Sequence, residues 1–155
     1  MMRIIGGCAL LLSCALTSSY IISVEKNKIE QIEAIIALIK RIRDRIDCYA
    51  MPVEKILNSA GDILLRLGIE KNITDFTQLL SECEIVCGED CKKILNTFAD
   101  TLGKGYREQQ VKLCDTTISA LEDIKRKLVS AYPSKKKTTI ALCFAFGGAL
   151  LIALL

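Results

Sequence analysis

The cysteines are the residues of this chain whose type and spacing are most suggestive of chemistry. Cys83, Cys87 and Cys91 recur every four residues, which places three thiols along one slowly drifting side of a helix. Thiolates bind zinc and act as nucleophiles or redox groups. A zinc site, however, usually has four ligands and a shorter Cys-x-x-Cys pair. Gly88 also interrupts the set, so we interpret the three thiols mainly as core-facing residues.

Little else in the sequence is suited to complete a catalytic site. The chain has no histidine, which removes the commonest general base, nucleophile partner and metal ligand. It has no Walker loop, dinucleotide-binding turn or nucleophile elbow. The acidic pairs Glu89-Asp90 and Glu122-Asp123 are sequence neighbours, which point in different directions on a helix. We therefore expect a protein that is not an enzyme and uses no cofactor or metal, with a thiol-based metal or redox protein as a weaker hypothesis.

Charge is confined to the middle of the chain. Of the 39 Lys, Arg, Asp and Glu residues, 38 lie between Glu25 and Lys137, and the exception is Arg3. The charge-free runs Ile4–Val24 and Thr138–Leu155 contain 21 and 18 residues. As helices they would be about 31 Å and 27 Å long, against a bilayer core of about 30 Å. Both runs are therefore long enough to cross a membrane.

This charge pattern predicts three parts. Residues 1–24 form an N-terminal transmembrane helix, residues 25–134 a cytosolic helical bundle, and residues 135–155 a basic collar and a C-terminal transmembrane helix. The middle carries 20 basic and 18 acidic residues, a net charge of +2 that gives no basic field for nucleic acid. Five of the eight cysteines lie there, and an odd number fits poorly with an oxidised, disulfide-bonded exterior domain.

Residues 1–24 are open to two other interpretations. A cleaved signal peptide would use the small residues at 15–18, but apolar residues resume at Tyr20. A lipoprotein would be lipidated at Cys14, but no polar tether follows that residue. The length of the run favours an uncleaved anchor.

The predicted orientation depends on five lysines at the membrane borders. Lys26 and Lys28 follow the first anchor, and Lys135, Lys136 and Lys137 precede the second. Positive residues near membrane segments tend to remain cytosolic, so both chain ends are expected across the membrane. The same lysines suit contact with lipid headgroups, or simple solubility.

The small residues of both anchors recur at four-residue spacing, which lets helices pack closely in lipid. They are Ala9, Ser13 and Thr17 in the first anchor, and Ala141, Ala145, Ala149 and Ala153 in the second. The functional interpretation is that the anchors pack on each other or on another membrane protein. The alternative is that alanine is simply common in such helices.

The hydrophobic period of the middle segment is helical throughout. The first anchor should continue as one helix to near Ala50, because the residue before Pro52 avoids helical geometry. The further helices are expected at 52–67, 74–86 (capped by Thr74 or Asn72), 89–102 and 106–132, the last stopped by Pro133. Short connections between them predict an all-α, antiparallel helical bundle.

The order of several motifs resembles the stage III sporulation protein AB family of endospore-forming bacteria. The motifs are Ile4-Ile5-Gly6 in the first anchor, Tyr49-Ala50-Met51-Pro52-Val53 after the long helix, Phe98-x-x-x-Leu102-Gly103, and Gln110 seven residues later. The resemblance covers the whole chain. One position departs from it, since family members often have Asp where this chain has Tyr106, a position suited to cap the last helix.

The resemblance implies a function at a membrane. The soluble domain of that family is similar to the cytoplasmic domains of platform proteins in type II secretion and type IV pilus machines. The implied partners are a secretion-type ATPase similar to stage III sporulation protein AA, other membrane components of the sporulation channel, and membrane lipids. The implied location is the outer forespore membrane. Leu102, Gly103 and Gln110 are then candidates for partner contact, with a purely structural turn as the alternative. A generic membrane-anchored scaffold unrelated to sporulation is the second functional hypothesis.

Overall fold

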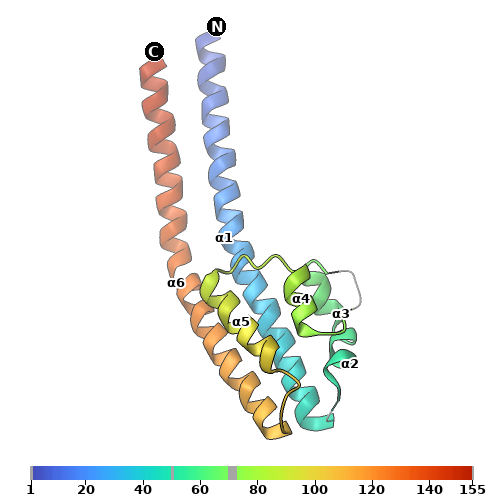
Figure 1. The fold of residues 1–155 in the computed structure, drawn as a ribbon. Helices are drawn as coiled ribbons and strands as arrows, with labels where there is room; N and C mark the ends of the chain where they lie inside the picture. Colours follow the sequence, from blue (N-terminus) through green and yellow to red (C-terminus); the bar gives the residue numbers. More distant parts are fainter. Residues whose placement is uncertain (1, 50, 70–72, 155) are drawn as a thin grey trace. The chain divides into compact units, whose positions relative to one another are not determined.

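A computed structural model describes the backbone of residues 2–49, 51–69 and 73–154, and the side chains of residues 12–49, 51–69 and 73–149. Over this described backbone the chain is helical without strands (Figure 1), which confirms the all-α prediction. The helices are α1 (Met2–Tyr49), α2 (Val53–Asn58), α3 (Gly61–Arg66), α4 (Phe76–Glu82), α5 (Glu89–Thr101) and α6 (Arg107–Leu154).

The chain divides into two compact units. The terminal unit contains Met1–Asn27 and Leu128–Leu155, and the bundle unit contains Lys28–Lys127. The two longest helices, α1 and α6, each contribute residues to both units.

The bundle unit is built around one apolar face of α1. Ile32, Ile35, Leu38, Ile39 and Ile42 recur at helical spacing and are at most 1% exposed. Burying each such side chain stabilises the fold by roughly 1.5–3 kcal/mol. Within this unit α5 and α6 lie beside α1 (Figure 1), and α2 to α4 cover its other side. The predicted helical bundle is therefore confirmed.

The α4 and α5 helices are packed together through two phenylalanines. The rings of Phe76 and Phe98 meet edge to face, with centroids 4.9 Å apart and an interplanar angle of 79°. Both side chains are at most 1% exposed. Such aromatic pairs add about 0.5–1.5 kcal/mol to the energy of burial alone.

The predicted helix at 52–67 is wrong in one respect, because the structure breaks it into α2 and α3. Ala60 leaves helical geometry, with φ −100° and ψ 27°. The Ser59 hydroxyl donates a 2.8 Å hydrogen bond to the Ile56 carbonyl, a local bond that competes with helix continuation. Gly61, which has a poor helix propensity, follows immediately.

The predicted helix at 74–86 is also corrected, since α4 spans only Phe76–Glu82. Its cap is Asp75, whose carboxylate accepts the Phe76 N–H at 2.7 Å, in place of the predicted Thr74. The other predicted cap, Asn72, lies outside the described residues. By contrast, α5 begins at Glu89 as predicted and ends at Thr101, one residue early.

Pro133 does not stop α6, which contradicts the sequence prediction. The helix begins at Arg107, one residue later than expected, and continues through Pro133 to Leu154. A proline removes one backbone donor and costs about 3 kcal/mol within a helix, but it does not remove the remaining hydrogen bonds. The bonds on either side are sufficient to continue the helix here.

In the terminal unit, α1 and α6 are joined by an ion pair between Glu25 and Lys135, at 3.1 Å. Large apolar side chains of both helices are exposed by 55–72%. They are Leu12, Leu16, Tyr20, Leu142, Phe144 and Phe146. The described residues include no helix that is sufficiently long and apolar to span a membrane. The predicted anchors extend into residues 1–11 and 150–155, whose side chains lie outside the described residues.

The described residues of the small-residue stripes lie at exposed positions of the terminal unit. Ser13, Thr17, Ala141, Ala145 and Ala149 are exposed, whereas Cys14, Cys143 and Gly147 are more covered. Ala9 and Ala153 lie outside the residues whose side chains are described. The packing of the two anchors through these stripes stays a prediction.

Candidate functional site

The turn between α5 and α6 is the best-defined feature among the predicted site residues. Leu102 leaves the helix with φ −61° and ψ 132°, and Gly103 follows with φ +81°. This left-handed conformation is costly for residues other than glycine, which explains the residue type at this position. Leu102 is partly buried, so it contributes to both the turn and the adjoining surface.

Gln110 holds this turn from the first turns of α6. Its Oε1 accepts the Gly103 N–H at 2.9 Å, and its Nε2 donates to the Lys104 carbonyl at 2.7 Å and the Thr101 carbonyl at 3.4 Å. The side chain is only 5% exposed. An amide with one acceptor and two donors is thus fully used on the backbone of the turn. Gln110 is therefore a structural clamp on the α5–α6 turn.

A second glutamine acts in the same way at the other end of α5. The Gln31 Nε2 donates to the Glu84 carbonyl at 2.7 Å, and its Oε1 accepts the Val86 N–H at 2.9 Å. Gln31 thereby fixes the connection between α4 and α5 to α1. The sequence analysis did not predict this role. The available signal is the position of Gln31 on the same helical stripe as Ile35 and Leu38, which places a polar side chain in line with the core-facing residues of α1.

Two clefts open at the end of the bundle unit where α1 ends and α6 begins. The first, here called the turn cleft, has a volume of about 500 Å³ and is lined by Leu102, Gly103 and Gln110, with Met51 and Pro52 from the α1–α2 connection. The predicted Pro52 and Leu102-Gly103 motifs therefore meet at one site. The second, called the charged cleft, has a volume of about 850 Å³. It is lined by Asp47, Tyr106, Arg107, Glu108, Val111, Lys112 and Asp115.

Arg107 lines both clefts. Its guanidinium donates to the Asp47 carboxylate at 2.9 Å and to the Asp47 carbonyl oxygen, so it joins the start of α6 to the end of α1. Two exposed tyrosines lie close in sequence to this ion pair. Tyr106, next to Arg107, is 82% exposed, and Tyr49, two residues after Asp47, is 67% exposed. The Arg45 guanidinium lies 5.4 Å from the centroid of the Tyr49 ring. Exposed tyrosine and arginine are the residue types that most often dominate protein interfaces.

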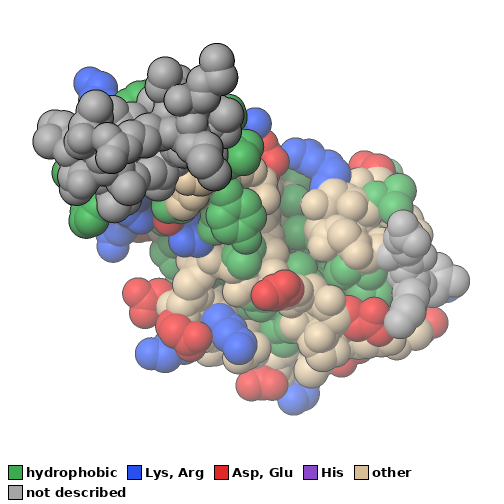
Figure 2. Space-filling model, turned by 90° about the horizontal axis from the view of Figure 1, so that it is seen from above, with side chains coloured by type: hydrophobic (Ala, Val, Ile, Leu, Met, Phe, Trp, Pro, Cys, Tyr) green, Lys and Arg blue, Asp and Glu red, His purple; other side chains and the backbone are tan. Residues whose placement is uncertain are grey.

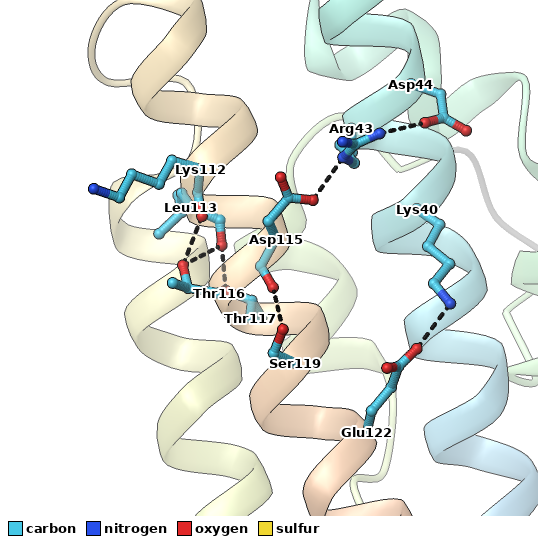
Figure 3. Close-up of polar contacts among 10 residues, drawn as sticks. All are labelled: Lys40, Arg43, Asp44, Lys112, Leu113, Asp115, Thr116, Thr117, Ser119 and Glu122. Carbon is cyan, nitrogen blue, oxygen red and sulfur yellow. Dashed lines mark hydrogen bonds and ion pairs between the residues drawn. The ribbon is translucent and has the colours of Figure 1, made fainter.

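Ion pairs hold α6 against α1 along the bundle unit. Figure 3 shows two of them: Lys40–Glu122 at 2.8 Å and Arg43–Asp115 at 2.6 Å. The hydrogen bonds that Arg43 donates to Asp115 and Asp44 raise the pKa of Arg43, and the hydrogen bond that Glu122 accepts from Lys40 lowers the pKa of Glu122. All these groups are solvent-exposed, so the pairs specify how the helices align more than they stabilise them. Charges of both signs are scattered over the bundle surface seen in Figure 2.

The three cysteines at four-residue spacing are buried in the bundle unit. Cys83, Cys87 and Cys91 are at most 7% exposed, and each cysteine whose side chain is described is a free thiol. Cys83 donates to the Leu67 carbonyl and accepts from Gln31. Among the described residues, no group of three or more histidine, cysteine or acidic side chains is placed to hold a metal ion.

The predicted membrane-border lysines belong to different units. Lys26, Lys135, Lys136 and Lys137 lie in the terminal unit, and Lys28 is the first residue of the bundle unit. All except Lys28 are exposed. Lys135 pairs with Glu25 within the terminal unit.

Comparisons with known proteins found no relative of this chain. No family model matches the chain, and no curated protein or solved structure has detectable similarity to it.

Proposed function

We propose that this protein is a membrane-anchored, non-enzymatic adaptor that couples a secretion-type ATPase to the channel between mother cell and forespore. The proposal that the protein is anchored in a membrane rests on the exposed apolar side chains of the terminal unit. Its exposed side chains include Leu16, Tyr20, Phe144 and Phe146, each at least 66% exposed. Apolar groups in such number favour removal from water, and a bilayer is the environment that matches two charge-free helical runs.

The proposed orientation places the bundle unit in the cytosol. The basic residues at its borders, Lys26, Lys28 and Lys135 to Lys137, support this orientation through the preference of positive charge for the cytosolic side. By resemblance, the membrane is the outer forespore membrane and the cytosol is that of the mother cell.

One motif behind the resemblance to the stage III sporulation protein AB family, Gly103 followed by Gln110, has a physical reason. The spacing of seven between Gly103 and Gln110 matches the hydrogen bond that joins them. A turn held in this way gives a fixed surface at the end of the bundle. We assign the partner contact to the exposed neighbours of the turn, Tyr106 and Arg107, and a structural role to Gly103 and Gln110.

The membrane half of the proposal is tested by alkaline extraction of membranes from cells that express the full chain. An integral protein stays in the membrane pellet, whereas release into the supernatant would contradict anchoring. The partner half is tested by affinity capture of the full chain from detergent-solubilised membranes of sporulating cells. Capture of a secretion-type ATPase is expected. Capture of membrane proteins without any such ATPase would favour the generic scaffold instead.

A further inference from the structure

Four lysines of the terminal unit are gathered at one level of its two helices. Lys135 of α6 pairs with Glu25 of α1 at 3.1 Å, which places these two residues side by side. Lys26 follows Glu25 directly, and Lys136 and Lys137 follow Lys135. Because a helix rises about 1.5 Å per residue, each of these lysines lies within roughly 3 Å of the ion pair along its helix axis. We call Lys26, Lys135, Lys136 and Lys137 the lysine belt.

The lysine belt faces several directions, because consecutive residues of a helix are turned by about 100° from one another. Lys135, Lys136 and Lys137 therefore point to three different sides of α6, and Lys26 extends from α1. All four residues are exposed. A long lysine side chain can keep its stem against an apolar surface while its ammonium group reaches water or a headgroup. Positive charge is thus presented around both helices at one level.

The positive charge of the belt is poorly balanced within its own unit. The terminal unit contains five basic residues, which are the belt and Arg3, but Glu25 is its one acidic residue. The bundle unit, by contrast, has 16 basic and 17 acidic residues. The net charge of +3 on the chain therefore arises from the terminal unit. An anionic ligand is the chemical complement of this surplus.

Exposed apolar side chains begin on one side of the belt. Tyr20 lies five residues before Glu25 and is 72% exposed, and Leu142 lies five residues after Lys137 and is 55% exposed. Since α1 and α6 run in opposite directions within this unit (Figure 1), both side chains lie on the same side of the belt. Each is roughly 7.5 Å from it along the helix axis. Lysines next to apolar groups, with a tyrosine near the boundary, are typical of the border between water and a bilayer.

We propose that the lysine belt binds the headgroups of anionic phospholipids. This inference rests on the membrane anchoring proposed above and adds the chemistry of the lipid that the protein prefers. The phosphate of an anionic headgroup accepts hydrogen bonds from the ammonium groups, whereas a zwitterionic headgroup also brings a cation that the same lysines repel. The apolar side chains beside the belt contact the acyl chains. The ligand is therefore a lipid rather than free phosphate, because both of its halves have a matching surface.

The contribution of the belt can be measured by replacing two of its members. Each lysine near an anionic membrane surface contributes about fivefold to binding. The double variant Lys136→Gln with Lys137→Gln keeps the pair between Lys135 and Glu25, and it should bind anionic lipid about 25-fold more weakly. The matched control is Lys92→Gln with Lys93→Gln, because these lysines are also consecutive, exposed and helical but belong to α5 in the bundle unit. The control should bind as the wild type does.

The test uses the full chain in detergent. Phosphatidylglycerol and phosphatidylcholine with the same acyl chains are titrated separately, and native mass spectrometry counts the bound lipids at low and high ammonium acetate. The expected result is tighter binding of phosphatidylglycerol by the wild type and the control, its loss in the belt variant, and a smaller preference at high salt. Equal binding of the two lipids by the wild type would overturn the proposal. Displacement of phosphatidylglycerol by an equal concentration of inorganic phosphate would overturn it as well.

Failure of this inference can be distinguished from failure of the proposed anchoring. A chain that remains in the membrane pellet after alkaline extraction, but binds the two lipids equally, would contradict the role of the lysine belt alone. A chain that stays in solution without detergent and binds neither lipid would contradict both proposals. Circular dichroism shows whether each variant is folded. Since the wild-type titrations alone can overturn the preference, a variant that fails to fold does not protect the proposal.

Discussion

Gln110 and Gly103 are joined by a hydrogen bond of 2.9 Å, in which the buried Oε1 of Gln110 accepts the Gly103 amide. Together with Gln31 at the opposite end of α5, Gln110 attaches both connections of this helix to the two long helices. The position of α5 is therefore set by two side-chain amides as well as by its apolar face.

Gln110→Leu should destabilise the protein by about 1–3 kcal/mol, because it leaves the Gly103 N–H and the Lys104 carbonyl without their buried partner. The measurement is chemical unfolding followed by circular dichroism. Gln109→Leu is the matched control, since Gln109 is exposed and makes only a 3.4 Å contact with the Tyr106 N–H. A change within about 0.5 kcal/mol is expected there. Equal losses for the two variants would contradict the clamp.

Tyr106→Asp should stabilise α6 by about 1 kcal/mol, because it supplies the missing side-chain acceptor at the helix start. The reciprocal half of this cap already exists, since the Gln109 Oε1 accepts the Tyr106 N–H. Tyr106→Ala removes the same ring without adding an acceptor and serves as the control. If thermal unfolding shows no difference between the Asp and Ala variants, the assigned cap position is wrong.

The stability of the bundle should decrease as the pH rises from about 9 to about 11, in part through Cys114. Burial raises the pKa of Cys114 from 9.0 to about 11. The folded state therefore keeps a proton that the unfolded state loses within this window. The contribution is complete below pH 9 and is lost as the pH rises through the folded pKa, with a slope of at most about 1.4 kcal/mol per pH unit.

The Cys114 effect is isolated as a difference between two proteins. Unfolding free energies of the wild type and Cys114→Ala are compared at each pH. The gap between them should narrow toward pH 11. A gap that stays constant across the window would show that the Cys114 thiol has the same pKa in both states.

Cys48 reports on the orientation of the bundle unit, because it is exposed whereas Cys83, Cys87, Cys91 and Cys114 are buried. In vegetative cells that express the chain in the cell membrane, a membrane-impermeant maleimide added from outside should not label Cys48 if the bundle is cytosolic. Labelling should appear after permeabilisation and disappear in Cys48→Ser. Labelling of intact cells at Cys48 would reverse the proposed orientation.

The long, strongly periodic elements were predictable from the sequence. The apolar spacing of Ile32, Ile35 and Ile39 identifies α1, and the positions of Glu89 and Gly103 bracket α5. The failures occur where a local interaction decides the outcome. The Ser59 hydroxyl breaks a helix, and Asp75 caps another at a position next to the predicted one. Pro133 was expected to end α6, but a single lost hydrogen bond does not outweigh those on either side.

The candidate site was predicted in part. Gly103 and Gln110 were singled out together, but only their hydrogen bond assigns them to the structure of the turn. The approach of Met51 and Pro52 to the same cleft depends on the packing of α1 against α6, which no local pattern contains. The pairing of Arg107 with Asp47 joins residues 60 positions apart, and many other arginine–aspartate pairs are compatible with the sequence.

The central claim is that the exposed residues around Tyr106 and Arg107 bind a secretion-type ATPase. The most direct measurement is quantitative capture of that ATPase by the full chain in detergent, comparing the wild type with Arg107→Glu and Arg126→Glu. The two arginines are matched, since both lie on α6, are exposed, and pair with an aspartate. The account predicts that Arg107→Glu loses the ATPase while it stays folded, and that Arg126→Glu retains it. Equal capture by all three proteins would contradict the assigned surface, and no capture by the folded wild type would contradict the adaptor function itself.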